Sequence, residues 1–142
     1  LFQVLVWSTL FISMAGMSWA ALAPQVPIPT YFPQQDKVEH LVGFFVLGAL
    51  LALGAGHRAY WFSLGFCLTL SIGVEYAQKA LTTTREFSLD DAAASALGGF
   101  IGLSFFSLCL WMGSLIVQKR LKPARGGSRA GARRASDASS AG

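Results

Sequence analysis

The sequence predicts an all-α protein, an integral membrane bundle of four transmembrane helices followed by a disordered basic tail. Charged residues make up only 13% of the 142 positions, about half of the 25% typical of a soluble domain. Four apolar stretches have about the length that a helix needs to cross a bilayer. We therefore expect a transmembrane domain over residues 1–117. The tail, 118–142, has too few large apolar side chains to fold.

We expect the four spans at about residues 4–23, 38–56, 60–81 and 89–117. The first contains no charged residue. A signal peptide that ends at Ala21-Leu22-Ala23 is the alternative interpretation of this stretch. No basic segment precedes it, and its apolar run exceeds the usual length for a signal peptide, so we favour the transmembrane helix.

The second span is preceded by the segment 24–37, whose four prolines exclude a continuous helix. Asp36 with Glu39, three residues further on, resembles a pair that caps the N-terminus of a helix. His40 follows four residues after Asp36, so both side chains lie on one helix face. The span therefore begins with a polar turn.

The third and fourth spans also meet at polar residues. Glu75 and Gln78 lie three residues apart, on one face of the last two turns of the third span. Ser88 precedes Asp91 by three residues, the spacing of a capping box, which predicts a helix that begins near Leu89. In the spans themselves, small residues allow neighbouring helices to approach closely, namely Gly43, Gly48, Ala52 and the pair Gly98 and Gly102.

The distribution of basic residues predicts the orientation. Arg58 lies in the turn between the second and third spans, on the same side of the membrane as the tail. The tail holds seven of the eleven Lys and Arg residues: Lys119, Arg120, Lys122, Arg125, Arg129, Arg133 and Arg134. Because positive charge marks the cytoplasmic side, we expect both termini in the cytoplasm and the tail at the anionic inner leaflet, where each basic residue contributes about 1 kcal/mol. Because most of the basic residues lie in this tail, we expect no nucleic-acid partner.

This orientation brings three polar helix ends to the outer membrane face. They are the start of the second span, the end of the third and the start of the fourth. We expect one cluster there, made of residues that are distant in the sequence: Asp36, Lys37, His40, Glu75, Gln78, Arg85, Asp91 and Ser95.

An ordered set of motifs resembles the VanZ-like family of small bacterial membrane proteins, which is named for a link to teicoplanin resistance. The motifs are Asp36-Lys37-x-x-His40-x-x-x-Phe44, Glu75-x-x-Gln78, Arg85-x-x-Ser88-x-x-Asp91 and Gly98-x-x-x-Gly102. Where the family usually has Asn, this chain has Ser95, which keeps a hydroxyl group but lacks an amide. The resemblance implies a four-helix protein of the bacterial inner (cytoplasmic) membrane and brings no established reaction with it.

The candidate residues also have structural alternatives: His40 and Glu75 as polar contacts between helices, Asp91 as a helix cap, and Arg85 as a loop charge. As a site, His40, Glu75 and Asp91 are the candidates for proton transfer. Lys37 and Arg85 are placed to hold an anion, with Asp36, Gln78 and Ser95 as further ligand contacts. The sequence contains none of the paired metal-ligand motifs and no nucleotide-binding loop, so we expect neither metal nor cofactor.

Two classes of function remain open, and the sequence does not decide whether a reaction is catalysed. The first is a protein that binds an anionic cell-envelope lipid, or a glycopeptide-related ligand, at the outer face. The second is a non-catalytic accessory or assembly subunit of a larger membrane complex. The first class predicts an outward cavity lined by the motif residues, and the second predicts a filled cluster of mutually paired groups.

Overall fold

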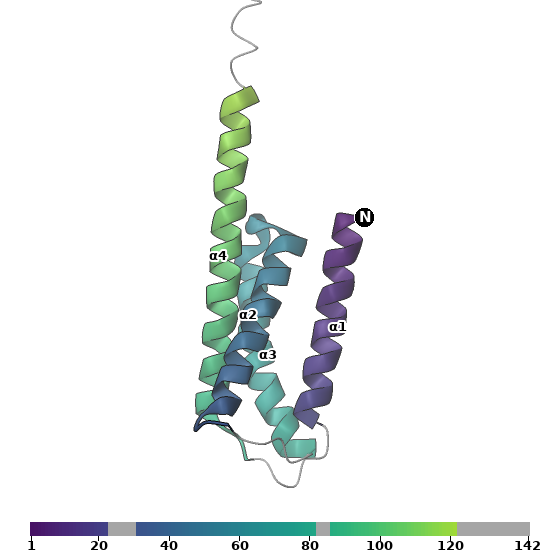
Figure 1. Ribbon diagram of the computed structural model, residues 1–142, viewed down its shortest axis with the longest axis vertical. Coiled ribbons are helices and arrows are strands. Elements are labelled where there is room, and N and C mark those ends of the chain that lie inside the picture. Colours follow the sequence, from purple (N-terminus) through teal and green to yellow (C-terminus); the bar gives the residue numbers. More distant parts are fainter. Residues whose placement is uncertain (23–30, 82–85, 122–142) are drawn as a thin grey trace, which may run out of the picture. The chain divides into compact units, whose positions relative to one another are not determined.

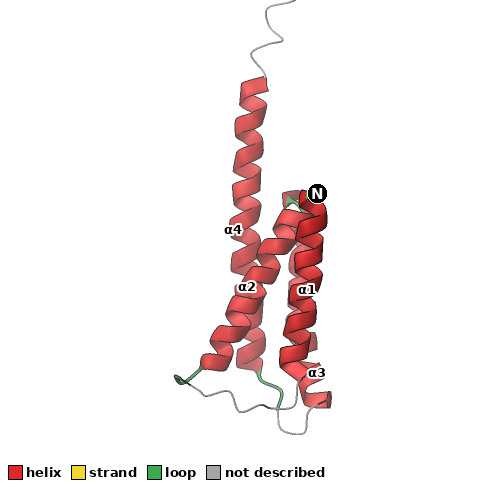
Figure 2. Cartoon of the chain, turned by 45° about the vertical axis from the view of Figure 1, so that its right-hand side comes forward, coloured by secondary structure: helices red, strands yellow, loops and turns green. Residues whose placement is uncertain are grey.

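The computed structural model describes residues 1–22, 31–81 and 86–121 of the chain. These residues form four α-helices, α1 (Phe2–Leu22), α2 (Gln35–Ala55), α3 (Tyr60–Leu81) and α4 (Leu89–Leu121), and a short 3-10 helix, η1 (His57–Ala59) (Figure 1). Figure 2 shows helices and connecting loops but no strand in this part of the chain. The predicted all-α class is confirmed.

The helix ends agree with the sequence in some places and differ in others. α3 has the predicted bounds, and α4 begins at the predicted Leu89, where Ser88 Oγ accepts a hydrogen bond of 3.2 Å from the Asp91 N–H. α4 ends at Leu121, four residues beyond the predicted span. Residues 118–121 are thus helical and not part of a disordered tail, because Gln, Lys, Arg and Leu all favour a helix. The expected disorder of 122–142 lies outside the described residues.

The expected capping pair at the start of α2 is wrong. The residue before the helix is Gln34, which has a left-handed backbone (φ 73°) and makes no side-chain cap. The side chain of Gln35 instead connects the preceding segment to the first turn of the helix. Its Oε1 accepts a hydrogen bond from the Tyr31 N–H at 3.0 Å, and its Nε2 donates to Glu39 Oε1 at 2.8 Å. Asp36 lies inside the first helical turn, where a carboxylate interacts favourably with the helix dipole.

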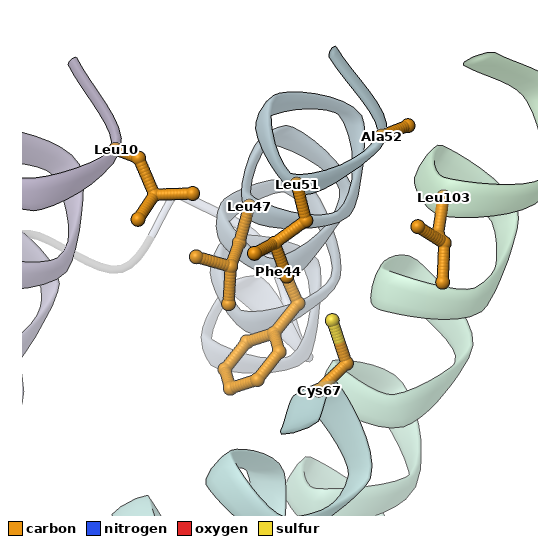
Figure 3. Packing of buried hydrophobic residues seen from close by; sticks show 7 residues of the cluster. All are labelled: Leu10, Phe44, Leu47, Leu51, Ala52, Cys67 and Leu103. Carbon is orange, nitrogen blue, oxygen red and sulfur yellow. The ribbon is translucent and has the colours of Figure 1, made fainter. Parts of the chain in front are cut away.

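The helices pack around a small apolar core within the compact unit Leu1–Leu110. α1 contacts α2 and α3, and α2 supplies most of the core side chains. Figure 3 shows the cluster, to which every helix contributes: Leu10, Phe44, Leu47, Leu51, Ala52, Cys67 and Leu103. The core fixes the polar helix ends relative to one another.

Backbone contacts bring α2 and α4 close together. A β-carbon on Gly98 would overlap the Leu41 carbonyl oxygen, and one on Gly102 would overlap the Phe45 carbonyl oxygen. A β-carbon on Gly48 would likewise lie 2.8 Å from the Leu103 backbone nitrogen. Only glycine permits this separation, so the three positions set the distance between the two helices.

α3 buries polar and small side chains and exposes large apolar ones. Its buried residues are Ser63, Cys67, Ser71, Glu75 and Gln78, and its exposed residues include Trp61, Phe62, Ile72 and Tyr76. An apolar outer surface of this extent is typical of a protein that contacts lipid.

Three of the described helices have a segment long and apolar enough to cross a membrane: Phe2–Trp19, Gln35–Ala55 and Leu89–Leu121. α3 is one residue longer than α2, and it exposes large apolar side chains such as Trp61, Phe62 and Ile72. Its length and exposed residues therefore agree with four transmembrane helices.

Candidate functional site

Polar side chains gather at one end of the helices, which we call the polar end. Here α2 begins, α3 ends and α4 begins, as Figure 1 shows. The convergence follows from helix order, because antiparallel neighbours place the start of one helix beside the end of the preceding one. Three consecutive helices thus each bring a motif of the sequence to the same end.

His40 is at the centre of this cluster, with its side chain only 10% exposed. A hydrogen bond of 3.0 Å joins its Nδ1 to Ser95 Oγ on α4. Its Nε2 lies 3.9 Å from Glu75 Oε1 on α3 and 4.0 Å from Asp36 Oδ1 on its own helix. The imidazole therefore connects α2, α3 and α4, and two carboxylates flank one of its ring nitrogens.

Glu75 is the most deeply buried carboxylate of the cluster, with 2% of its side chain exposed. Its Oε2 accepts a hydrogen bond of 3.2 Å from the Ser88 N–H, immediately before α4. Because Ser88 Oγ caps α4 through the Asp91 N–H, Glu75 is linked to the start of that helix. Burial of a carboxylate is costly unless hydrogen bonds or cations compensate it, and the Ser88 N–H and the His40 ring supply this compensation.

Lys37 forms the outer part of the cluster. Its Nζ makes an ion pair with Asp90 Oδ2, which joins the first turns of α2 and α4. The side chain of Lys37 is 37% exposed and that of Asp90 is more exposed still. An exposed pair of this kind contributes about 0–1 kcal/mol, so it can be exchanged for another partner at little cost.

A shallow cavity lies beside the cluster, before and at the start of α2. Its volume is about 490 Å³, and it is lined by Tyr31, Phe32, Pro33, Gln34, Gln35 and Asp36. Only Asp36 belongs to both the cavity and the cluster. The cavity is thus next to the motif residues and is not lined by most of them.

The structure places the predicted site residues as follows. Asp36, Lys37, His40, Glu75 and Ser95 come together through the contacts above. Gln78 is buried on the face of α3 that carries Glu75. Asp91 is half-buried in the first turn of α4, and Arg85 lies outside the described residues.

Two partners in this cluster are missing from the sequence prediction. The Ser88 N–H is a backbone group, which no residue pattern reveals. Asp90 directly precedes the predicted Asp91, and only the packing of α2 against α4 distinguishes the two carboxylates. Asp90 is the carboxylate that forms the ion pair with Lys37.

The arrangement can bind polar groups and transfer protons. The two nitrogens of His40 face a hydroxyl group on one side and carboxylates on the other, and a neutral imidazole donates from one nitrogen and accepts at the other. Among the described residues, no group of three or more His, Cys, Asp or Glu side chains is placed to hold a metal ion. The chemistry that the described side chains offer is that of hydrogen bonds, charge and proton transfer.

A comparison with protein families gives one match to report. The family model described as VanZ/LLP1 matches residues 2–111, which include all four helices up to the second half of α4 and every described residue of the cluster. Comparisons with curated proteins and with solved structures give no match.

Proposed function

The chain belongs to the VanZ/LLP1 family, and from this premise we propose that it is a multi-pass protein of the bacterial cytoplasmic membrane that binds the anionic headgroup of a cell-envelope lipid. The observation that carries the proposal is the position of Lys37, an accessible cation that is paired with Asp90 and lies three residues before the buried His40 on α2. The apolar outer surface of the helices supports the membrane location.

The distribution of charge supports an orientation with both termini in the cytoplasm. Arg58 lies in η1, between the end of α2 and the start of α3, and these two helix ends are opposite the polar end. The segment 119–134 contains seven basic residues and no acidic one. Positive charge marks the cytoplasmic side, so the polar end faces outward, towards the outer leaflet and the cell wall.

The binding mode follows from the exchangeable ion pair. A phosphate oxygen of the lipid replaces Asp90 as the partner of Lys37, since charge-assisted hydrogen bonds to phosphate are among the stronger ones in proteins. His40, one helical turn from Lys37 on α2, is the second donor, and the buried Glu75, with Oε1 3.9 Å from His40 Nε2, orients its ring. A glycopeptide-related ligand, which also carries hydroxyl groups and an anion, is the alternative occupant.

Lipid binding by the purified full-length chain in detergent tests this proposal. The probes are phosphatidylglycerol and an uncharged diacylglycerol with the same acyl chains. We expect Lys37→Gln to weaken binding of phosphatidylglycerol by about tenfold, the equivalent of one charge-assisted hydrogen bond. Asp90→Asn should strengthen this binding, because it removes the carboxylate that competes with the phosphate.

Lys79→Gln is the matched control. Lys79 is an exposed cation in the last turn of α3, at the same end of the helices. Its loss changes the net charge of that end by the same amount but leaves the cluster intact. Equal effects of the Lys37 and Lys79 variants, or equal binding of charged and uncharged lipid, would contradict a headgroup site at Lys37.

The second candidate is a non-catalytic accessory or assembly subunit of a larger membrane complex. The mutual pairing of the polar groups favours it, because His40 bonds to Ser95 and Lys37 pairs with Asp90 within the chain itself. Glu75→Gln separates the two candidates. In a binding protein it keeps the melting temperature and abolishes lipid binding, whereas in a purely structural cluster it lowers stability and cellular function together.

The cellular readout is teicoplanin susceptibility, the property for which the family is named. We expect expression of the wild-type chain to change susceptibility and the Glu75→Gln variant to lack this effect at equal abundance in the membrane. If the Glu75→Gln variant still changes susceptibility, this effect does not depend on the polar end.

A further inference from the structure

The cavity beside the cluster has the composition of a site for a cationic group. Of its lining residues, Tyr31 and Phe32 present exposed aromatic rings, and Asp36 presents a carboxylate. Aromatic faces attract cations through their quadrupole, and a neighbouring carboxylate adds a full negative charge. Tyr31 is 80% exposed, so its ring is accessible to a ligand.

A hydrogen bond holds this segment against the helix. The Tyr31 N–H donates to Gln35 Oε1 at 3.0 Å, and Gln35 Nε2 donates to Glu39 Oε1 at 2.8 Å. The chain from the aromatic rings to the first turn of α2 is therefore linked through side chains of that turn. The backbone at Tyr31 is thus held near the first turn of α2, to which Asp36 belongs.

Asp36 joins the cavity to the cluster. Its side chain is 51% exposed, and its Oδ1 lies 4.0 Å from His40 Nε2. Lys37, the next residue, is rotated by about 100° around the helix and points its ammonium group at Asp90. A ligand that straddles these two positions meets a carboxylate on one side and an ammonium group on the other.

The net charge of the polar end also favours a ligand with a positive group. The segments 31–40 and 75–91 contain six carboxylates, Asp36, Glu39, Glu75, Glu86, Asp90 and Asp91, against three basic residues, Lys37, Lys79 and Arg85. This excess weakens, without abolishing, the binding of a ligand that carries only negative charge. A phosphate that carries an ammonium group on a short linker is attracted at both of its ends.

We propose that the polar end recognises an aminophospholipid headgroup, with the phosphate at Lys37 and the primary ammonium group in the cavity between Asp36 and the rings of Tyr31 and Phe32. This inference rests on the proposed function and names the headgroup that the same site selects. It adds the segment 31–35, which precedes the first family motif, to the part of the chain that determines specificity.

Competition between two lipids tests the inference. Purified full-length chain in detergent is titrated with phosphatidylethanolamine and with phosphatidylglycerol of identical acyl chains, and both dissociation constants are measured. We expect phosphatidylethanolamine to bind about tenfold more tightly, since one ion pair with an aromatic contact is worth about one order of magnitude. Asp36→Asn should bring the ratio of the two constants close to one.

Two variants complete the design. Glu86→Gln, which removes one exposed negative charge at the same end of the helices, is the matched control and should keep the preference. Tyr31→Leu should reduce the ratio about threefold, as expected for loss of a cation–π contact at an exposed site. Because Tyr31 is exposed, this variant tests the cavity even if Asp36→Asn lowers the melting temperature.

The outcomes separate the inference from the proposed function. Equal affinity for both lipids, with dependence on Lys37 retained, overturns the amine selectivity and leaves the headgroup site standing. Loss of Lys37 dependence for both lipids overturns both. Water-soluble phosphoethanolamine should displace the bound lipid at millimolar concentration, and its failure to do so would show that the acyl chains, not the headgroup, determine binding.

Discussion

The two glycines where α4 meets α2 give the sharpest prediction about stability. Substitution Gly98→Ala places a methyl group 2.9 Å from the Leu41 carbonyl carbon and closer still to its oxygen. The obstacle is backbone and not a flexible side chain, so the two helices must separate to relieve the overlap. Separation weakens the packing of Phe44 and Leu103 in the core, which lie close to the same contact.

The expected cost follows from two opposing terms. Overpacking a well-packed interior costs about 1–3 kcal/mol, and Ala stabilises a helix over Gly by up to about 1 kcal/mol. We therefore expect Gly98→Ala to lower the free energy of unfolding by about 1–2 kcal/mol. Gly102→Ala should cost a similar amount, because its methyl group would meet the Phe45 backbone in the same way.

The double variant adds a second test. Once the helices have separated to accept one methyl group, the second needs little further movement, so the two costs should sum to more than the cost of the double variant. Equilibrium unfolding in mixed detergent micelles, followed by circular dichroism, measures the free energy of unfolding of the two single variants and the double variant. Gly73→Ala is the control, because a β-carbon there meets nothing within 4 Å. If Gly98→Ala is as stable as Gly73→Ala, the close approach of α2 and α4 is not a stabilising feature.

Three further predictions concern topology, the tail and the buried carboxylate. A reporter that is active only in the periplasm should be inactive when fused at Gly142 and active when inserted between Gln34 and Gln35; activity at Gly142 would reverse the proposed orientation. Truncation after Lys122 should leave the melting temperature in detergent unchanged, since the removed sequence has no apolar pattern to pack, and a large drop would show that the tail docks on the helices. Glu75→Ala should lower the unfolding free energy by about 1–3 kcal/mol, because it leaves the Ser88 N–H without its acceptor; an unchanged value by denaturant titration would mean that water replaces the carboxylate.

The features that the sequence could predict are those that depend on periodicity. Helix spacing correctly placed Asp36 beside His40, and chain order brought the polar ends of α2, α3 and α4 together. The bounds of α3 and the start of α4 followed from apolar length and the Ser88 cap. Each of these inferences needs only residues close in the chain, together with the alternation of direction that short connections impose.

The features that could not be predicted depend on distances between helices. A hydrogen bond between His40 and Ser95 requires that α2 and α4 approach closely, which the glycines permit but their spacing does not prove. The helix α2 starts one residue before Asp36 because Gln35 bridges the turn with its amide, a role that the pattern of acidic residues conceals. At the other end of α3, the hydrogen bond between Tyr60 and Ser104 has no local signature either.

The polar buried face of α3 has a consequence for how the protein enters a membrane. Carboxylate and amide side chains oppose insertion of an isolated helix, by as much as about 2.5–3.5 kcal/mol for an acidic residue at mid-membrane depth. Only Gly56 and the three residues of η1 separate α2 from α3, so the two helices can insert as one hairpin. His40 then meets Glu75 during insertion, and the apolar α2 carries its polar neighbour into the bilayer. The biogenesis of α3 should therefore depend on the helix before it, and in a chain that begins at Tyr60 we expect α3 to fail to integrate.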